Sequence, residues 1–170
     1  MKSLNVMAKS LLGIMVMLLL AGVWVMPAAA AGPEPQERDF SGLEYMLKLA
    51  LIRAEAQQDR LDTGRAVADV AEEFIAGEQG KGFDTGKLEA ALSTLRRQIE
   101  EAQSLHDTAA QILADKAGFD EEGQVVDPRQ ARNTLATAHR SMRDAGETLR
   151  RAHQDFRQAL RDYRQNKRGN

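Results

Sequence analysis

The sequence predicts an all-α protein, an elongated antiparallel bundle of three long helices that follows a cleaved signal peptide. Apolar side chains recur every seven residues through three long segments, as they do where helices pack side by side. Helix-start residues precede each segment, and no stretch of useful length alternates apolar and polar residues as a half-buried strand does. We therefore expect a helical domain over 41–166, with helices at about 42–77, 85–117 and 128–166.

The first 31 residues carry the pattern of a secretory signal peptide. Two lysines precede a 16-residue apolar run at 11–26, and a short stretch of alanines and a glycine follows it. We expect cleavage near Ala30 or Ala31 and a secreted or periplasmic location. An uncleaved N-terminal membrane anchor is the alternative, although the run is shorter than the roughly 20 apolar residues of a typical membrane span.

The mature chain after cleavage has the length of one domain and contains no cysteine, so its fold depends on its core without disulfide bonds. Residues 32–40 hold two prolines and several charges but no apolar pattern, which predicts a disordered leader. The last residues, 167–170, are predicted to form a disordered tail.

The first predicted helix, 42–77, begins with a capping box, in which Ser41 caps the helix and Glu44 reaches back to the cap. Its core row is Leu47, Ala54, Leu61, Ala68 and Ile75. This row keeps its seven-residue phase through the Asp-Thr-Gly sequence at 62–64, which predicts one continuous helix. A break at 62–64, which would give four helices, is the alternative. Gly77 is placed where a left-handed residue ends many helices.

Asp-Thr-Gly occurs a second time at 84–86, and paired catalytic aspartates are typical of aspartic proteases. In those enzymes the loops join strands of an all-β framework, whereas both copies here lie in helical surroundings. We interpret Asp84 as the N-terminal cap of the second helix. The sequence holds no recognisable arrangement of nucleophile, base and acid, so the chain is predicted not to be an enzyme.

The second and third helices also carry seven-residue rows. The second has Leu88, Leu95, Ala102 and Ala109 beside Leu92, Ile99, His106 and Leu113. The third has Leu135, Met142, Leu149, Phe156 and Tyr163 beside Ala131, Ala138, Ala145, Ala152 and Ala159. A large residue that alternates with alanine predicts seams in which helices approach closely. Gly118 marks the end of the second helix, Asp127 caps the third, and Pro128 occupies its first position.

Two histidines predict a polar level inside the bundle. In the antiparallel arrangement His106 of the second helix and His139 of the third fall at one level, beside Gln57 of the first. Imidazole is a common ligand of zinc, copper and nickel, so a metal site completed by Glu55 or Asp59 is one hypothesis. A polar layer that fixes the helix register, or histidines at the wet rim of the bundle, are the alternatives. No cofactor is predicted.

The charges of the chain are divided unevenly. Residues 32–127 hold 10 basic and 21 acidic residues, whereas residues 128–170 hold 11 basic and 4 acidic ones. One position of the third helix's seven-residue pattern is filled by arginine five times, at Arg129, Arg143, Arg150, Arg157 and Arg164. This row predicts an exposed basic face that attracts an acidic protein or an anionic envelope surface.

We therefore expect a secreted or periplasmic, non-enzymatic helical interaction protein that uses this basic face. A metal-binding or metal-responsive envelope protein is the alternative. The alanine-rich seams also fit pairing between two chains, so a homodimer is a further hypothesis. Nucleic acid is not expected as a partner, because no aromatic side chains are interleaved with the arginines.

Overall fold

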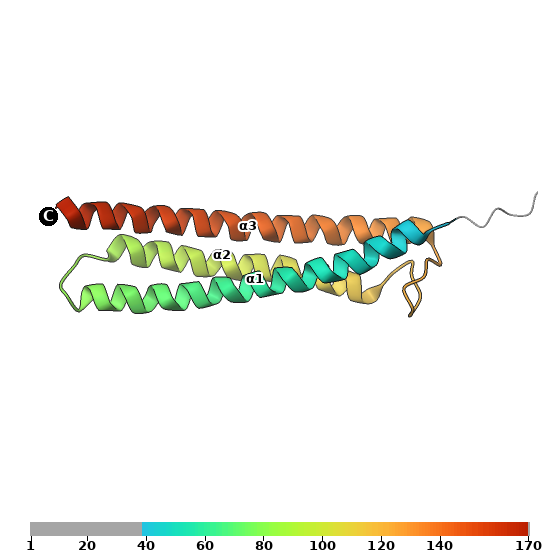
Figure 1. Cartoon of the computed structure of the whole chain (residues 1–170), viewed down its shortest axis with the longest axis horizontal. Coiled ribbons are helices and arrows are strands. Elements are labelled where there is room, and N and C mark those ends of the chain that lie inside the picture. The colour runs from blue at the N-terminus through green and yellow to red at the C-terminus, as the bar shows by residue number, and fades with distance from the viewer. Residues whose placement is uncertain (1–38, 170) are drawn as a thin grey trace, which may run out of the picture. The chain divides into compact units, whose positions relative to one another are not determined.

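The computed structural model describes residues 39–169, and in this part the chain forms three helices, α1 (Ser41–Gln79), α2 (Gly86–Asp115) and α3 (Pro128–Gly169). α2 runs antiparallel to α1 and α3, and the helices lie side by side along their lengths (Figure 1). The described residues contain no strand, and a single β-bridge joins Phe119 to Val125. The predicted all-α bundle of three helices is confirmed.

Residues 1–38, which hold the predicted signal peptide and nearly all of the predicted leader, lie outside the described residues, so both stay predictions. Among the helices of residues 39–169, none combines the length and the apolar character needed to cross a membrane.

The start of α1 differs from the predicted capping box. Asp39 accepts the Ser41 N–H at 2.9 Å through its carboxylate, and Ser41 itself makes no capping bond. Glu44 instead accepts the backbone N–H of Val125 at 3.3 Å, in the loop that joins α2 to α3. The box is therefore wrong, because a tertiary partner holds the carboxylate that was expected to return to its own helix end.

α1 is continuous through Asp62–Gly64, as the unbroken phase of its core row predicted. It extends beyond Gly77 to Gln79, and the left-handed glycine after it is Gly82, with φ of +82°. The predicted end at Gly77 is wrong by two residues. A glycine inside a helix costs only about 1 kcal/mol relative to alanine, so it does not by itself end the helix.

The other helix ends lie close to their predicted positions, but α2 begins at Gly86 with Thr85 at the cap position, so the prediction that Asp84 caps it is wrong. α2 ends at Asp115 and is followed by left-handed Lys116. Asp127 caps α3 as predicted, since its carboxylate accepts the N–H groups of Arg129 at 2.9 Å and Gln130 at 3.1 Å. α3 then continues to Gly169, through most of the segment predicted to be a disordered tail.

The core consists of the rows that the seven-residue pattern predicted. Buried apolar residues are Leu47, Ala50, Ala54, Leu61, Ala68, Ala71 and Ile75 in α1; Leu88, Leu92, Leu95, Ile99, Ala102, Ala109 and Leu113 in α2; and Ala131, Ala138, Met142, Ala145, Leu149, Ala152 and Phe156 in α3. Three members of the predicted rows, Leu135, Ala159 and Tyr163, are only partly buried. Each fully buried leucine contributes about 1.5–3 kcal/mol to folding. The bundle therefore rests on two apolar clusters, with the buried polar side chains of Gln57 and His106 between them, rather than on its surface ion pairs.

Two contacts fix the register of the parallel helices α1 and α3. The Gln57 side chain donates to the Met142 carbonyl at 2.7 Å, and the Tyr163 hydroxyl donates to Glu78 at 2.7 Å. Both pairs are separated by 85 positions, so a residue of α1 lies level with the residue 85 positions later in α3. Packing between these two helices is the least extensive of the three pairings.

Candidate functional site

The five arginines predicted to form a basic face are all exposed on α3; they are Arg129, Arg143, Arg150, Arg157 and Arg164, and we call them the arginine row. Arg143 forms an ion pair with the neighbouring Asp144 at 2.7 Å. Arg150 bonds only to the neutral side chain of Gln154, at 3.2 Å. Within the described residues, no carboxylate forms an ion pair with the other four members of the row.

The arginine row borders the side of α3 that faces α1. His153 lies against Gly64 of α1, and Lys167 forms an ion pair with Glu78 of α1. Arg150 precedes His153 by three residues and Arg164 precedes Lys167 by three, and residues at this spacing are neighbours on a helix surface. The row is therefore aligned along the α1–α3 junction rather than on the far side of α3.

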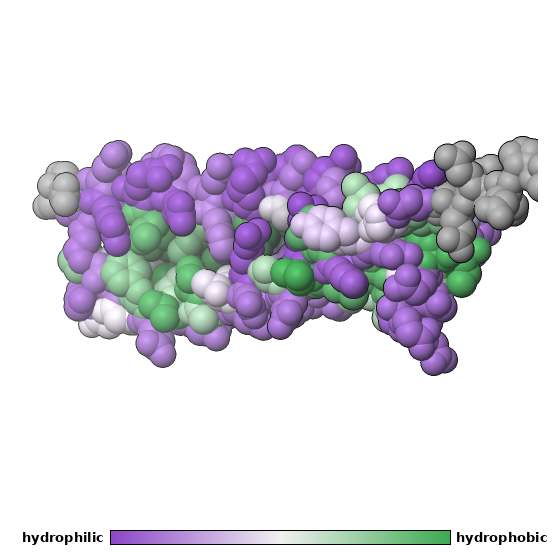
Figure 2. Space-filling view, turned by 45° about the vertical axis from the view of Figure 1, so that its right-hand side comes forward, coloured by the Kyte–Doolittle hydropathy of each residue, from purple (hydrophilic) through white to green (hydrophobic). Residues whose placement is uncertain are grey.

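An exposed apolar strip lies on α1 at this junction. It consists of Val67, Val70 and Phe74, which keep 44%, 65% and 39% of their surface exposed. The Phe74 ring packs edge-on against Tyr163 of α3, with ring centroids 6.1 Å apart, and this contact fixes the side of α1 on which the strip lies. Figure 2 shows hydrophobic side chains gathered on one face near the C-terminal end of α3, with hydrophilic side chains along their edges.

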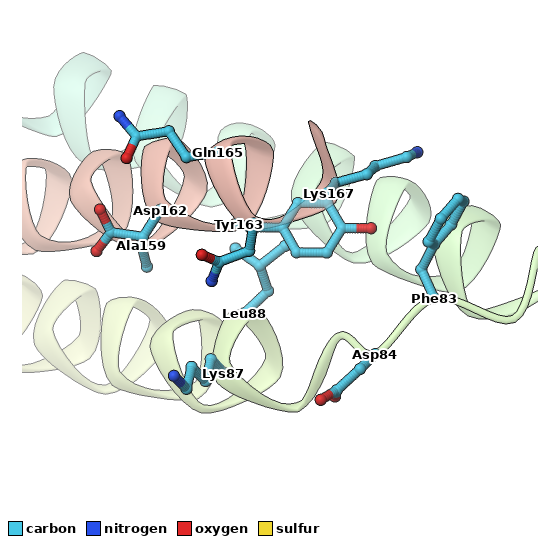
Figure 3. Close-up of a pocket in the computed structure, with 10 residues that line it drawn as sticks. Phe83, Asp84, Lys87, Leu88, Ala159, Asp162, Tyr163, Gln165 and Lys167 are labelled. Carbon is cyan, nitrogen blue, oxygen red and sulfur yellow. The ribbon is translucent and has the colours of Figure 1, made fainter. Parts of the chain in front are cut away.

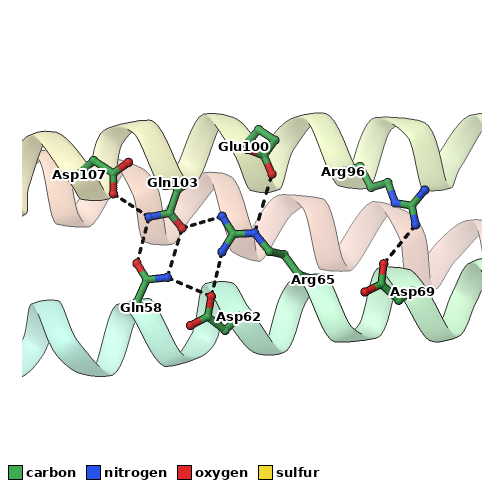
Figure 4. Close-up of polar contacts among 8 residues, drawn as sticks. All are labelled: Gln58, Asp62, Arg65, Asp69, Arg96, Glu100, Gln103 and Asp107. Carbon is green, nitrogen blue, oxygen red and sulfur yellow. Dashed lines mark hydrogen bonds and ion pairs between the residues drawn. The ribbon is translucent and has the colours of Figure 1, made fainter.

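Three acidic residues of α1, which are Asp62, Asp69 and Glu72, are paired with arginines on the side of α1 that faces α2. Arg65 binds Asp62 at 2.8 Å and the Gln103 side chain at 2.8 Å, and Gln58 joins the same network (Figure 4). One turn further along, Arg96 of α2 binds both Asp69 and Glu72 of α1, at 3.2 Å and 2.7 Å. These carboxylates are therefore satisfied locally and do not neutralise the arginine row.

Glu78 is the one buried carboxylate among the described residues. It accepts hydrogen bonds from Lys167 and Tyr163 of α3 and from Lys81 in the loop after α1. These bonds, that of Lys167 foremost, lower its pKa to about 2. Burial and the adjacent Glu78 raise the pKa of Tyr163 to about 12. The Lys167 ammonium also lies 3.9 Å from the centre of the Phe83 ring.

An open pocket of about 680 Å³ lies beside this cluster, between the start of α2 and the end of α3 (Figure 3). Lys87 and Lys167 line it together with Asp84, Asp162 and Tyr163. The two cations and two carboxylates give this pocket no dominant charge. The cluster around Glu78 was not predicted, although Glu78 lies in the buried row that runs through Ala50, Gln57, Gly64 and Ala71.

The four residues of the predicted metal site differ in burial. His106 is buried, and its Nδ1 lies 3.3 Å from the Gln57 side-chain oxygen, whereas His139, Glu55 and Asp59 are exposed. Among residues 39–169, no three His, Asp or Glu side chains stand close enough together to hold a metal ion. The geometry thus places His106 in a hydrogen bond with Gln57 and gives the metal hypothesis no support.

The chain was compared with protein-family models, curated proteins and solved structures. No protein-family model, curated protein or solved structure matches the chain significantly.

Proposed function

We propose that this chain is a non-enzymatic interaction protein, secreted or periplasmic, that docks an acidic partner through the arginine row of α3. The observation that carries the proposal is the exposed row itself, in which Arg129, Arg150, Arg157 and Arg164 form no ion pair with a carboxylate of the described residues. Charges of one sign along a helix attract an oppositely charged surface and raise its rate of association.

The charge distribution also orients the partner. Residues 32–127 hold 21 acidic and 10 basic residues, so an acidic partner is repelled from the rest of the domain. Attraction between exposed charges is screened over a Debye length of about 8–10 Å at physiological ionic strength. We therefore expect docking at the arginine row alone, and we expect the affinity to fall as salt is raised.

The test uses fluorescently labelled polyglutamate, a flexible acidic chain, and measures its anisotropy with the purified protein at about 50 and 200 mM salt. Replacing Arg150, Arg157 and Arg164 with Gln should weaken binding by roughly 10–100-fold, since exposed ion pairs contribute up to about 1 kcal/mol each. The matched control replaces Lys48, Lys87 and Arg97, which are exposed on α1 and α2, with Gln.

The control removes the same three charges from other faces and should change the affinity by less than about threefold. Equal losses in the two triple variants would mean that polyglutamate senses only net charge, and the proposal would then be wrong. Far-UV circular dichroism of both variants checks that the helices are intact.

A further inference from the structure

We infer that the α1–α3 junction receives an amphipathic helix of a partner protein, with its apolar side on the strip of Val67, Val70 and Phe74 and an acidic flank on the arginine row. The inference rests on the proposed function, because it uses the same arginines. It goes further by assigning a secondary structure and a charge pattern to the partner.

The strip and the row lie at the same level of the bundle. With the 85-residue register, Val67 to Phe74 is level with residues 152–159 of α3. Arg150 and Arg157 therefore lie alongside the strip, and Arg164 lies one to two turns beyond it. An apolar contact and an ionic contact are thus available to one bound segment at the same time.

The spacing of the strip matches a helix lying along it. Its side chains stand at positions i, i+3 and i+7 of α1, and they span about 10 Å at 1.5 Å per residue. A docking helix presents its apolar side chains with this same spacing. Arg60 stands seven residues before Val67 on the same side of α1, and α1 ends at Gln79, five residues after Phe74. The apolar contact is therefore limited to about two turns.

The outer edge of the strip decides between a helix and a lipid surface. Glu73 follows Val70 by three residues, is exposed, and forms no ion pair within the described residues. Across the face the order is therefore arginine row, apolar strip, then carboxylate. An anionic lipid surface pressed on this face would meet Glu73 with like charge. A helix that carries acid on one flank and base on the other meets both edges favourably.

The probe is a synthetic helical peptide with leucines at i, i+3, i+4 and i+7, glutamates on one flank and lysines on the other. Its partner peptide replaces the leucines with glutamine and keeps every charge. We expect the leucine peptide to bind the purified protein at least tenfold more tightly in calorimetry. We expect Val70→Ser to weaken this binding at least fivefold. The matched control, Ile52→Ser, changes a residue of α1 that is 61% exposed and lies outside the strip, and it should leave binding unchanged.

Polyglutamate separates this inference from the proposed function. The Val70→Ser variant should bind polyglutamate as the unchanged protein does, since that probe needs only the arginine row. If Val70→Ser leaves leucine-peptide binding intact while the arginine triple variant abolishes it, the helix site is wrong and the proposed function stands. If the triple variant binds polyglutamate normally, the proposed function itself fails.

Two further outcomes would overturn the helix site by naming another occupant. One is binding to phosphatidylglycerol vesicles that depends on Val70 while the leucine peptide does not bind, which would identify a lipid surface. The other is a concentration-dependent dimer in sedimentation that Val70→Ser dissociates, which would identify a second copy of the chain. We expect the unchanged protein and the Val70→Ser variant to sediment alike. We expect the affinity for the leucine peptide to depend on Val70.

Discussion

The hydroxyl of Tyr163 in α3 donates a 2.7 Å hydrogen bond to the carboxylate of Glu78, a buried residue in the last turn of α1. Lys81 and Lys167 donate to the same carboxylate, so one acidic group ties the end of α1 to the loop after it and to the end of α3. This contact lies at the end of the bundle where α1 passes into the loop before α2. Titration of the Tyr163 hydroxyl therefore reports on the contact that joins α1 and α3.

The loss of folding stability at alkaline pH should depend on Tyr163. Burial, together with Glu78, raises the pKa of Tyr163 from 10.0 to about 12 in the folded protein. The folded state then holds the phenolic proton more tightly than the unfolded state. The resulting stabilisation is complete below about pH 10 and is lost as the pH rises from 10 to 12. We expect Tyr163→Phe to be less stable than the unchanged protein in urea at pH 7, and the difference to shrink across this range.

Tyr45 supplies the matched control for that measurement. It is 66% exposed near the start of α1, so Tyr45→Phe should leave both the stability and its alkaline limb unchanged. A Tyr163→Phe variant that loses stability above pH 10 as steeply as the unchanged protein would contradict the assignment to this hydrogen bond.

The helices and core rows were predictable because the seven-residue pattern records burial directly. The continuity of α1 through Asp62–Gly64 followed from that phase alone. The actual end of α1 at Gln79 and the tertiary contact of Glu44 were not predictable from local rules. The Gln79 carbonyl accepts the N–H of Gly82 in the loop after α1, and Glu44 is held by Val125, 81 positions away. Local propensity cannot register a partner that only the fold brings near.

The candidate site was predictable in part for the same reason. The arginine row occupies one position of the seven-residue pattern, so its shared face on α3 followed from periodicity, and the row proved exposed. The apolar strip of Val67, Val70 and Phe74 was not singled out, because it lies beside the core row and interrupts no pattern. His139 was predicted to lie level with His106, but it is exposed. The height of a residue along the bundle does not determine which side of its helix the residue faces.

His153 should weaken the fold in mild acid. Its Nε2 is buried without a hydrogen-bond partner, close to Gly64 of α1. Burial, and secondarily the charge of Arg157, lowers the pKa of His153 below its ordinary 6.5. The folded state keeps this imidazole neutral while the unfolded chain takes up a proton. Stability is therefore complete above about pH 6.5 and falls as the pH drops through the lowered pKa.

We expect His153→Leu to flatten the stability curve in urea between pH 7 and 5. His139→Leu, at an exposed position of the same helix, is the control for removing a histidine as such. Histidine titration by NMR would provide a second measurement. A titration midpoint of His153 at or above 6.5 would contradict this assignment, because burial would then not be disfavouring the charged form.

Gln57 and His106 should behave as a coupled pair. The Gln57 amide nitrogen donates to the Met142 carbonyl at 2.7 Å, so its oxygen faces Nδ1 of His106 at 3.3 Å, and Nδ1 is the donor. Gln57→Leu leaves that buried donor unsatisfied, which costs about 1–3 kcal/mol. Replacing both residues with Leu removes the orphaned group, so the double variant should cost less than the sum of the single variants.

Urea unfolding of the two single variants and the double variant measures this coupling. Strictly additive losses would show that the two side chains do not interact in the folded state. An independent check is that the heat capacity and the denaturant slope stay similar across the set, because each variant keeps the same buried surface.

Three glycines should respond differently to alanine because their backbones and neighbours differ. Gly118 has φ of +90°, and a Cβ built there lies 2.2 Å from the Ala131 nitrogen. Gly123 has φ of +84°, but its nearest contact is the Leu47 side chain at 3.5 Å. Gly146 lies inside α3, and its built Cβ is 3.5 Å from the Gln57 amide nitrogen, which is an ordinary contact.

The expected order of stability follows from these three environments. Gly146→Ala should stabilise the bundle by up to about 1 kcal/mol, since alanine is the better helix former and the Gln57 side chain has room. Gly123→Ala should cost about 1–2 kcal/mol, the price of a left-handed backbone for a residue with a Cβ. Gly118→Ala should cost more than either, because its strained backbone adds to a clash with the first turn of α3. Thermal and urea unfolding would rank the three variants. A Gly118→Ala protein as stable as Gly123→Ala would show that the loop before α3 can move away from Ala131, and that the tight turn at Gly118 is not required to start α3 where it does.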